Sequence, residues 1–388
     1  MILTLQTTTF GVLGGIPTYN RLMCRALNAF DGASDKTVLI GTDTPADLET
    51  RHKELPSLSL VPFSRNRRGF AQQTLKVGAT RKIDLALIGH VNYAPLGAML
   101  KRLQPSMRYG VILYGIDAWN RLPVLRRRAL QKADFIISIS DYTRRKAVQS
   151  NELDPRRTDL LLNALEWVDE RGVGGPASAP AIQGTRLLSV CRLEESERYK
   201  GVDKVIEALP AIAEKVPDVQ YLIVGGGSDL ERHRRLAQDC GVADRVHFLG
   251  FLSEDDLRSA YANCHVFVLP SAGEGFGFVF LEAMKYAKAV VAANSGGAPE
   301  VVLDQVTGRL IEYEDKQALT SALIDLCLDS AKREQLGRNG YQRLQEHFTY
   351  PQFEQKLNEI LVREMPASSF YRGRRDYALN AELARHQA

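Results

Sequence analysis

The chain alternates from its first residues to about residue 350 between short apolar runs and amphipathic helical patterns. In the first half the strand-like runs include Met1–Leu5, Thr37–Ile40, Ala86–Ile88, Arg108–Leu113 and Phe135–Ser138. In the second half they include Arg186–Val190, Val219–Val224, Val246–Phe248, Val266–Leu269 and Ala289–Ala292. Continuous Val, Ile and Leu runs separated by helices are typical of parallel strands that are covered on both faces. The pattern therefore predicts an α/β fold.

The length of 388 residues exceeds the usual size of one α/β domain. Arg171–Gly184 is rich in Gly, Ala and Pro and has the composition of a linker. We predict an N-terminal Rossmann-like domain at 1–172 and a second Rossmann-like domain at 182–350. A C-terminal helix and tail at 351–388 would then be free to pack back on the first domain. Two doubly wound domains would face each other across a cleft, where ligands of such sheets bind.

Cysteine usage and apolar patterning indicate the compartment. The five cysteines are scattered and form no C-x-x-C pair, so we interpret them as small buried residues in a reducing compartment, with no metal site: Cys24, Cys191, Cys240, Cys264 and Cys327. The N-terminus lacks the basic and apolar regions of a signal peptide, and no run approaches the roughly 20 apolar residues of a membrane span. We expect a cytoplasmic protein.

Charge is distributed unevenly along the chain. Residues 1–180 hold 25 Lys+Arg against 16 Asp+Glu, or +9, and the remainder 25 against 30, or −5, which sums to the net +4. The first part contains two clusters, Arg65, Arg67, Arg68 and Arg126, Arg127, Arg128. These are either solvated faces or a footprint for anionic lipid headgroups or a pyrophosphate-bearing acceptor, which would allow peripheral contact with the inner face of the membrane. No nucleic-acid-binding motif accompanies them, so we expect no nucleic-acid partner.

The segment Leu269–Gly297 is the most informative part of the sequence. A strand ends near Pro270, a Gly-rich loop follows, and a helix is predicted to begin near Phe278. Such a loop places the backbone N–H groups of Gly275, Phe276, Gly277 and Phe278 at a helix N-terminus. That arrangement is suited to an anion such as a diphosphate.

Two glutamates lie around this turn. Glu274 is in the loop, where a carboxylate could simply stabilise the helix dipole. Glu282 lies in a largely apolar helix, so it is expected to be buried rather than solvated. A buried carboxylate requires partners. Hydroxyl groups of a ribose and a sugar ring would serve.

The order of these residues resembles the retaining GT-B glycosyltransferases, specifically family 4. The resemblance rests on E-x7-E at Glu274 and Glu282 followed by Gly296–Glu300, on the Arg-Leu to Lys-Gly segment within Ser189–Asp203, on Leu222–Gly227, on Val246–Leu252 and on Thr307–Gly308. These motifs span most of residues 186–315 in the family's order.

The resemblance implies roles for individual residues. Arg192 and Lys200 would bind the donor diphosphate, and each cation about 4 Å away contributes on the order of 4 kcal/mol at an effective dielectric near 20. Glu282 would hold the ribose hydroxyls. Glu274, with the amides of 275–278, would hold the transferred sugar. Backbone groups near Phe251 and Leu252 would border the base.

The first domain resembles the family more weakly. Gly14 and Gly15 precede a helix and could approach a phosphate or acceptor, although a plain strand-to-helix turn explains them equally well. His90 follows a strand and matches a histidine of the family that faces the donor sugar. Tyr114–Trp119 resembles the family's His-Gly-x-Glu segment, with Tyr114 for His and Asp117 for Glu, which leaves an acceptor role for Asp117 open.

These observations predict a metal-independent hexosyltransferase. The sequence has no Asp-x-Asp motif for a cation, and Arg192, Lys200 and the helix amides can replace a metal, so no cofactor is expected. The resemblance implies transfer with retention from a nucleotide sugar, GDP-mannose or a UDP-sugar, to a glycan or lipid-linked saccharide in polysaccharide biosynthesis.

Other functions remain open on the sequence alone. A glycoside hydrolase could use Glu274 and Glu282 as its carboxylate pair, but would not explain Arg192 and Lys200. A dehydrogenase is suggested by Gly225–Gly227, yet the spacing does not fit the dinucleotide fingerprint. A nucleotide-sugar epimerase or a non-catalytic sugar-binding module of the same architecture is a further alternative.

Overall fold

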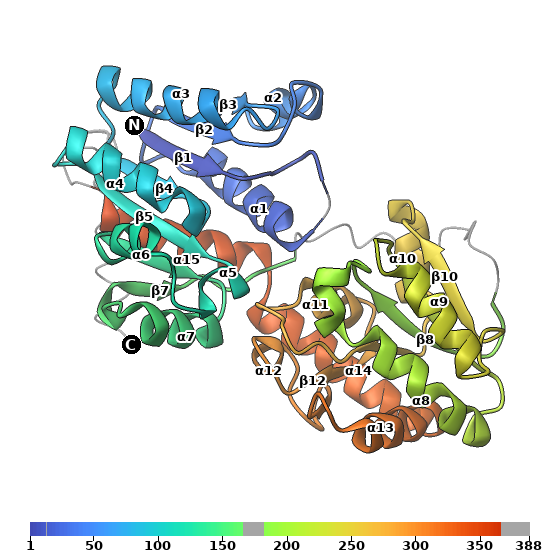
Figure 1. Ribbon diagram of the computed structural model, residues 1–388. Coiled ribbons are helices and arrows are strands. Elements are labelled where there is room, and N and C mark those ends of the chain that lie inside the picture. Colours follow the sequence, from blue (N-terminus) through green and yellow to red (C-terminus); the bar gives the residue numbers. More distant parts are fainter. Residues whose placement is uncertain (13, 166–181, 366–388) are drawn as a thin grey trace. The chain divides into compact units, whose positions relative to one another are not determined.

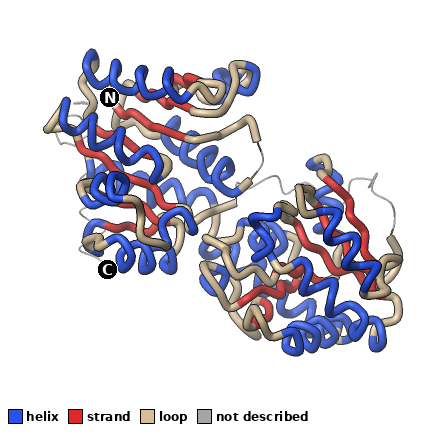
Figure 2. The backbone as a smooth tube through the Cα atoms, in the orientation of Figure 1, coloured by secondary structure: helices blue, strands red, loops and turns tan. Residues whose placement is uncertain are grey.

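The computed structural model describes residues 1–12, 14–165 and 182–365 (Figure 1). The chain divides into two compact units, of which unit 1 comprises Met1–Ala164 and the chain from Tyr350 onward, and unit 2 comprises Leu165–Thr349. Each unit contains one sheet (Figure 2). The predicted linker at Arg171–Gly184 lies mostly outside the described residues, and the predicted tail beyond residue 365 lies entirely outside them.

Unit 1 contains a seven-stranded parallel sheet in the order β3-β2-β1-β4-β5-β6-β7. Its strands are β1 (Ile2–Gln6), β2 (Lys36–Ile40), β3 (Ser59–Pro62), β4 (Leu85–Ile88), β5 (Arg108–Leu113), β6 (Phe135–Ser138) and β7 (Thr158–Leu160). Every residue of β1, β2 and β4 is buried, as expected for central strands covered by helices on both faces.

The helices of unit 1 form two layers around this sheet (Figure 1). They are α1 (Gly15–Ala29), α2 (Arg51–Glu54), α3 (Arg67–Thr80), α4 (Ala94–Leu103), α5 (Ile116–Trp119), α6 (Val124–Gln131), α7 (Asp141–Asn151) and α15 (Tyr350–Glu364), with short 3-10 turns η1 (Ala46–Leu48), η2 (Val91–Tyr93) and η3 (Pro155–Arg157). Helix α4 packs against α3 and α6, whereas α1 packs against α15.

Unit 2 also contains one parallel sheet, with six strands in the order β10-β9-β8-β11-β12-β13. They are β8 (Thr185–Val190), β9 (Val219–Val224), β10 (Val246–Gly250), β11 (Val266–Leu269), β12 (Ala289–Ala293) and β13 (Gly308–Ile311). The helices are α8 (Val202–Lys215), α9 (Leu230–Asp239), α10 (Glu254–Asn263), α11 (Phe278–Lys285), α12 (Ala298–Val301), α13 (Lys316–Leu328) and α14 (Ser330–His347), with the 3-10 segment η4 (Glu195–Lys200). Helix α8 packs against α9 and α13, and α11 packs against α14.

The last described helix, α15, belongs to unit 1 although it follows unit 2 in the chain. Its Phe353 packs edge-to-face on Tyr19 of α1, with ring centroids 5.4 Å apart. Its Glu364 accepts a hydrogen bond from Arg108 of β5 at 2.5 Å, and Arg363 forms an ion pair with Asp159 of β7. Unit 1 is therefore closed by a segment that lies more than 180 residues from the rest of it in sequence.

Candidate functional site

The strand order of unit 2 reverses between β8 and β11, and the loops that follow these strands leave the same edge of the sheet in opposite directions. Such switch points are where parallel α/β sheets bind ligands. The loop after β8 carries Arg192 and Lys200, and the loop after β11 carries Glu274. The topology thus brings together residues whose roles the sequence predicts.

Lys200 and Glu274 form an ion pair at this edge. The Lys200 Nζ lies 2.5 Å from Glu274 Oε1, and their side chains are only 18% and 11% exposed. Burial lowers the pKa of Lys200, but the adjacent Glu274 carboxylate outweighs burial, so that the pKa is raised overall. Lys200 therefore stays charged near neutral pH, and each side chain supplies one polar contact to the other.

The loop that carries Glu274 is held in place by backbone bonds to two neighbouring segments. Ala272 N donates to Tyr199 O at 2.8 Å, which joins the loop to the Lys200 segment. On the other side Ser295 Oγ donates to Ala272 O and Gly297 N donates to Glu274 O, both at 2.8 Å. The Glu274 carboxylate is therefore presented by a fixed backbone.

Gly296 and Gly297 permit this close approach. A Cβ on Gly296, whose φ is +62°, would lie 2.2 Å from Glu274 O, and one on Gly297 would lie 2.4 Å from Gly275 O. Both contacts are with backbone, which cannot move aside as a flexible side chain can. The Gly-Gly pair in the sequence thus has a structural reason.

Helix α11 begins at Phe278 and is preceded by Gly277 at φ 100°, with no side-chain cap. The amides of Gly275, Phe276, Gly277 and Phe278 donate to no acceptor in the described part of the chain. The positive end of the helix dipole and these N–H groups therefore remain available to an anion or a hydroxyl beside Glu274.

Glu282 lies one turn into α11 and is half-buried. Its Oε2 accepts a hydrogen bond from the Tyr261 hydroxyl at 2.6 Å. Burial raises the pKa of Glu282, and the Tyr261 hydrogen bond and Lys285 oppose that rise. The sequence predicts partners for this carboxylate, but it gives no sign of Tyr261, which lies on α10.

Arg192 is the most exposed of the predicted diphosphate ligands, with 64% of its side chain accessible, and it pairs with Glu197. Glu197 Oε2 is buried and has no hydrogen-bond partner within the described chain. A small open hollow lies beside the pair and is lined by Arg192, Leu193, Glu194, Glu197, Arg198, Lys200, Val202 and His233. The loop cations therefore border a hollow about the size of a water molecule.

Phe251 and Leu252 follow β10 immediately. Phe251 is 76% exposed, and its ring lies 3.2 Å from the position that a Cβ on Gly226 would take. An aromatic ring exposed beside the β9 turn is compatible with the predicted border of a nucleotide base.

In unit 1 the strand order reverses between β1 and β4. Gly14, with φ 148°, precedes α1 in the connection after β1, and Gly15 is the first residue of that helix. His90 lies two residues after the end of β4. The predicted residues of the first half therefore also gather at the switch point of their own sheet.

His90 is neutral at physiological pH. Its Nδ1 accepts from Asn92 N at 3.1 Å, and its ring stacks on Tyr114 with centroids 6.2 Å apart. Burial, assisted by the charge of Arg126, lowers the pKa of His90 to about 4. Because Nδ1 is an acceptor, the proton lies on Nε2, which can donate to a substrate oxygen.

Tyr114 and Asp117, which depart from the family's pattern, have structural partners. The Tyr114 hydroxyl donates to Asn20 Oδ1 at 2.8 Å, and Tyr114 N donates to Asp117 Oδ1 at 3.1 Å. Asp117 Oδ2 is buried without a hydrogen-bond partner in the described chain. Burial raises the pKa of Asp117 to about 7.

Two features are absent from the residues that the structure describes. No helix among them combines the length and hydrophobicity that are needed to cross a bilayer. No group of three or more His, Cys, Asp or Glu side chains among them is arranged to hold a metal ion.

Sequence comparisons relate the chain to sugar-transferring enzymes. The profile of the family described as glycosyl transferases group 1 matches residues 184–343. A GDP-mannose-dependent alpha-(1-6)-phosphatidylinositol monomannoside mannosyltransferase of Mycobacterium tuberculosis is 33% identical over 305 residues, which cover 73% of this chain and 77% of that protein. A GDP-mannose-dependent monoacylated alpha-(1-6)-phosphatidylinositol monomannoside mannosyltransferase of Corynebacterium glutamicum is 36% identical over 309 residues, with the same coverage of 73% and 77%.

Solved structures share the architecture. The Anabaena protein HepE in complex with UDP and glucose superposes with a TM-score of 0.74 at 20% identity, over 93% of this chain and 99% of that one. Sucrose-phosphate synthase from Thermosynechococcus elongatus gives a TM-score of 0.71 at 21% identity, over 93% and 98%. These likenesses confirm the predicted GT-B class of two parallel-sheet α/β domains.

Proposed function

The chain belongs to the glycosyl transferases of group 1, and on that premise we propose that it moves a hexose from a nucleotide sugar to a saccharide acceptor with retention of configuration, as in family 4. The observation that carries the proposal is the Lys200–Glu274 pair beside the amides of 275–278 at the β8/β11 switch point. A cation, a carboxylate and a helix N-terminus meet there. Together they can bind both the diphosphate and the sugar of a nucleotide sugar.

We assign the donor contacts as follows. Arg192 and Lys200 bind the diphosphate, and Glu282 binds the ribose hydroxyls. Glu274 and the amides of 275–278 bind the sugar, while residues near Phe251 and Leu252 border the base. Glu274 can contribute its Oε2, because Oε1 is held by Lys200. In unit 1, Gly14 and Gly15 approach a phosphate or the acceptor, and His90 faces the donor sugar.

The reaction proposed is front-face substitution without a metal ion. The bond from the sugar to the donor diphosphate breaks, and a bond to the acceptor oxygen forms on the same face through an oxocarbenium-like state. The departing phosphate oxygen takes the proton of the acceptor hydroxyl. Lys200, Arg192 and the helix amides stabilise the negative charge that grows on the diphosphate, which is the role a divalent cation has in other transferases.

GDP-mannose is the donor that the relatives favour, because both mannosyltransferases described above are GDP-mannose-dependent. Their names also point to a lipid-linked acceptor, so we propose a lipid-linked saccharide or glycan as the acceptor here. The excess of basic residues in 1–180 supports peripheral contact with an anionic membrane.

A ligand screen tests the donor assignment. Thermal unfolding is followed with GDP, UDP and ADP and their common sugars, each with and without EDTA. Ligand at 100 times its dissociation constant should add about 2.7 kcal/mol to the free energy of unfolding. We expect GDP and GDP-mannose each to raise Tm, and we expect EDTA to leave the size of each shift unchanged. A response to UDP alone would change the donor, and a response that EDTA abolishes would contradict the metal-free site.

Product analysis tests the stereochemistry. The protein is incubated with GDP-mannose and phosphatidylinositol mannoside acceptors, and the new linkage is examined by NMR. An α-linkage from the α-configured donor is expected. A β-linkage would contradict retention, and release of free mannose without transfer would favour the hydrolase alternative.

A further inference from the structure

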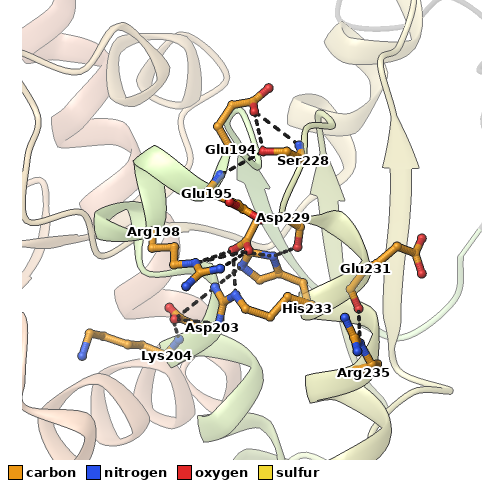
Figure 3. Close-up of polar contacts among 11 residues, drawn as sticks. Glu194, Glu195, Arg198, Asp203, Lys204, Ser228, Asp229, Glu231, His233 and Arg235 are labelled. Atoms are coloured by element: carbon orange, nitrogen blue, oxygen red, sulfur yellow. Dashed lines mark hydrogen bonds and ion pairs between the residues drawn. The ribbon is translucent and has the colours of Figure 1, made fainter.

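The loop that carries Arg192 and Lys200 packs against the turn that follows β9 (Figure 3). Leu193 N donates to Gly226 O at 2.9 Å, and Asp229 N donates back to Leu193 O at 2.8 Å. This exchange is a short backbone ladder between two loops at the carboxyl edge of the sheet. It fixes the start of the cationic loop.

Side chains extend the contact between the two loops. Ser228 Oγ donates to Glu194 Oε2 at 2.7 Å and accepts from Glu195 N at 3.1 Å. The approach is so close that only glycine fits: a Cβ on Gly225 would lie 1.9 Å from Cys191 O, and one on Gly227 would lie 2.4 Å from Leu193 O. The Gly225–Gly227 run therefore has a packing role against this loop.

Asp229 lies at the centre of the polar contacts in Figure 3. Its side chain is 1% exposed, and it accepts from Arg198 Nη2 at 2.8 Å and from Arg232 Nε at 2.6 Å. Asp229 is the N-cap residue of α9, yet its carboxylate makes no capping hydrogen bond. Burial raises the pKa of this carboxyl, but Arg198 and Arg232 outweigh burial and hold the pKa below its usual value.

The same network reaches the chain beyond Lys200. Arg232 lies 3.4 Å from Asp203 Oδ2 in the first turn of α8. His233 is buried, and its Nδ1 lies 2.8 Å from Asp229 O. Contacts therefore hold the chain on both sides of Lys200, at Arg198 before it and at Asp203 after it.

Hydrophobic packing does not fix this segment. No residue of η4 (Glu195–Lys200) is buried. Buried ion pairs are a weak source of stability, because desolvation offsets their attraction and apolar replacements are often neutral. The Asp229 network supplies a further fixed contact for a segment that contains no buried residue.

We propose that Asp229, acting through Arg198, is a positioning residue that presets Arg192 and Lys200 for the diphosphate of the donor. This inference rests on the proposed function. A charged loop that is fixed before binding loses less conformational entropy when the ligand arrives. Asp229 touches no ligand itself, and its effect is expected in donor affinity.

The test compares GDP binding by calorimetry in the full-length wild type and in Asp229→Asn. Asn keeps the shape but removes the charge that holds Arg198. We expect Kd for GDP to rise about tenfold, which corresponds to roughly 1.4 kcal/mol. Arg198→Met should have the same effect, and Arg198→Lys should restore part of the affinity. The KM for the donor should rise in parallel while the KM for the acceptor stays unchanged, which a general loss of folded protein would not produce.

Arg234→Met is the matched control. Arg234 is 50% exposed against 51% for Arg198, and it pairs with Glu231 on α9 at 3.0 Å. This variant should leave Kd within about twofold of the wild type. If Arg198→Met weakens binding but Asp229→Asn does not, Arg198 is a direct ligand and the inference fails. If the wild type binds neither GDP nor UDP, the proposed function itself fails.

Discussion

At the residue scale, the central feature is that Lys200 and Glu274 are each other's partner before any ligand binds. The Glu274 carboxylate raises the pKa of Lys200, so the ammonium stays charged although its side chain is largely buried. The two groups are expected to serve different parts of the donor. Replacing them one at a time therefore separates their contributions.

Lys200→Met should weaken GDP binding, because a diphosphate ligand is lost and Glu274 remains as an unpaired carboxylate nearby. Glu274→Gln should leave GDP affinity unchanged or improve it, since Lys200 is then freed for the phosphates. Transfer should fall by roughly 10²–10³ in kcat for Glu274→Gln. Calorimetry and steady-state rates on the two variants measure this. Equal losses of GDP affinity in both would contradict the division of roles.

Asp117 gives a prediction about pH. The pKa of its carboxyl is raised to about 7 by burial, from a model-compound value of 3.8, so the folded state binds a proton more readily than the unfolded state. Its contribution to stability is therefore present below about pH 4 and is lost as pH rises to about 7. Asp117→Asn removes this dependence, so the Tm of the variant minus that of the wild type should increase between pH 5 and pH 8. A difference that is constant over this range would contradict the raised pKa.

The sequence predicts that four residues share one donor site: Arg192, Lys200, Glu274 and Glu282. The structure brings the first three to one edge of the unit 2 sheet. The sequence does not indicate the residues that contact this site from within the protein, namely Glu197, Tyr261 and Asp229. The two residues of each pair are separated in sequence by 5 positions for Arg192–Glu197 and by 31 for Arg198–Asp229. These separations follow no helix or strand period. Such pairings depend on the tertiary fold, so no local sequence pattern predicts them.

At the element scale, the glycine turns decide how closely the loops can approach. Gly297 has an ordinary φ of −85°, so its requirement is one of space: a Cβ would meet Gly275 O at 2.4 Å. Gly225 and Gly227 meet the loop after β8 in the same way. The site is thus built by backbone contact between loops as much as by side chains.

Gly297→Ala should displace the Glu274 loop by several tenths of an ångström or more, because the opposing atoms are backbone. We expect transfer activity to fall about 10²-fold, as is typical of misplaced catalytic groups. Gly69→Ala is the control, since its Cβ would meet mainly the flexible Asn66 side chain at 2.7 Å. It should leave the rate nearly unchanged. Full activity in Gly297→Ala would show that the loop tolerates movement.

The strand runs read from the sequence all overlap strands of the structure, whereas β3, β7 and β13 were not among them. Each of these three lies at the edge of its sheet. Edge strands are covered on fewer sides, and here they are short, with exposed or half-buried positions. The apolar signal that reveals a central strand is therefore weak in them.

At the scale of the whole molecule, the chain leaves unit 1 at Ala164, builds unit 2, and returns as α15 to complete unit 1. The sequence predicts the two-domain division from its length and from the Gly- and Pro-rich stretch. The first boundary of the units, between Ala164 and Leu165, lies before the predicted linker. The return of α15 depends on tertiary contacts such as Phe353 on Tyr19.

Phe353→Ala should destabilise unit 1 selectively. Phe353 is 3% exposed, and truncation of such a residue typically costs about 3–5 kcal/mol. The transition whose Tm rises with GDP is assigned to unit 2. In calorimetry with GDP, we expect this transition to have the same Tm in Phe353→Ala as in the wild type. The other transition should have a lower Tm in the variant. Equal shifts of both would mean that the units unfold as one.

The two ends of unit 2 lie side by side: Leu165 N donates to Phe348 O at 3.0 Å, and Leu165 bridges Thr349. During synthesis, everything that unit 2 needs has left the ribosome once residue 349 emerges. Unit 1, begun first, still lacks its closing helix at that moment. Unit 2, which comes second in the sequence, can therefore finish folding first. At that moment the nascent chain would hold a complete unit 2, whereas Tyr19 of unit 1 would still lack its contact with Phe353.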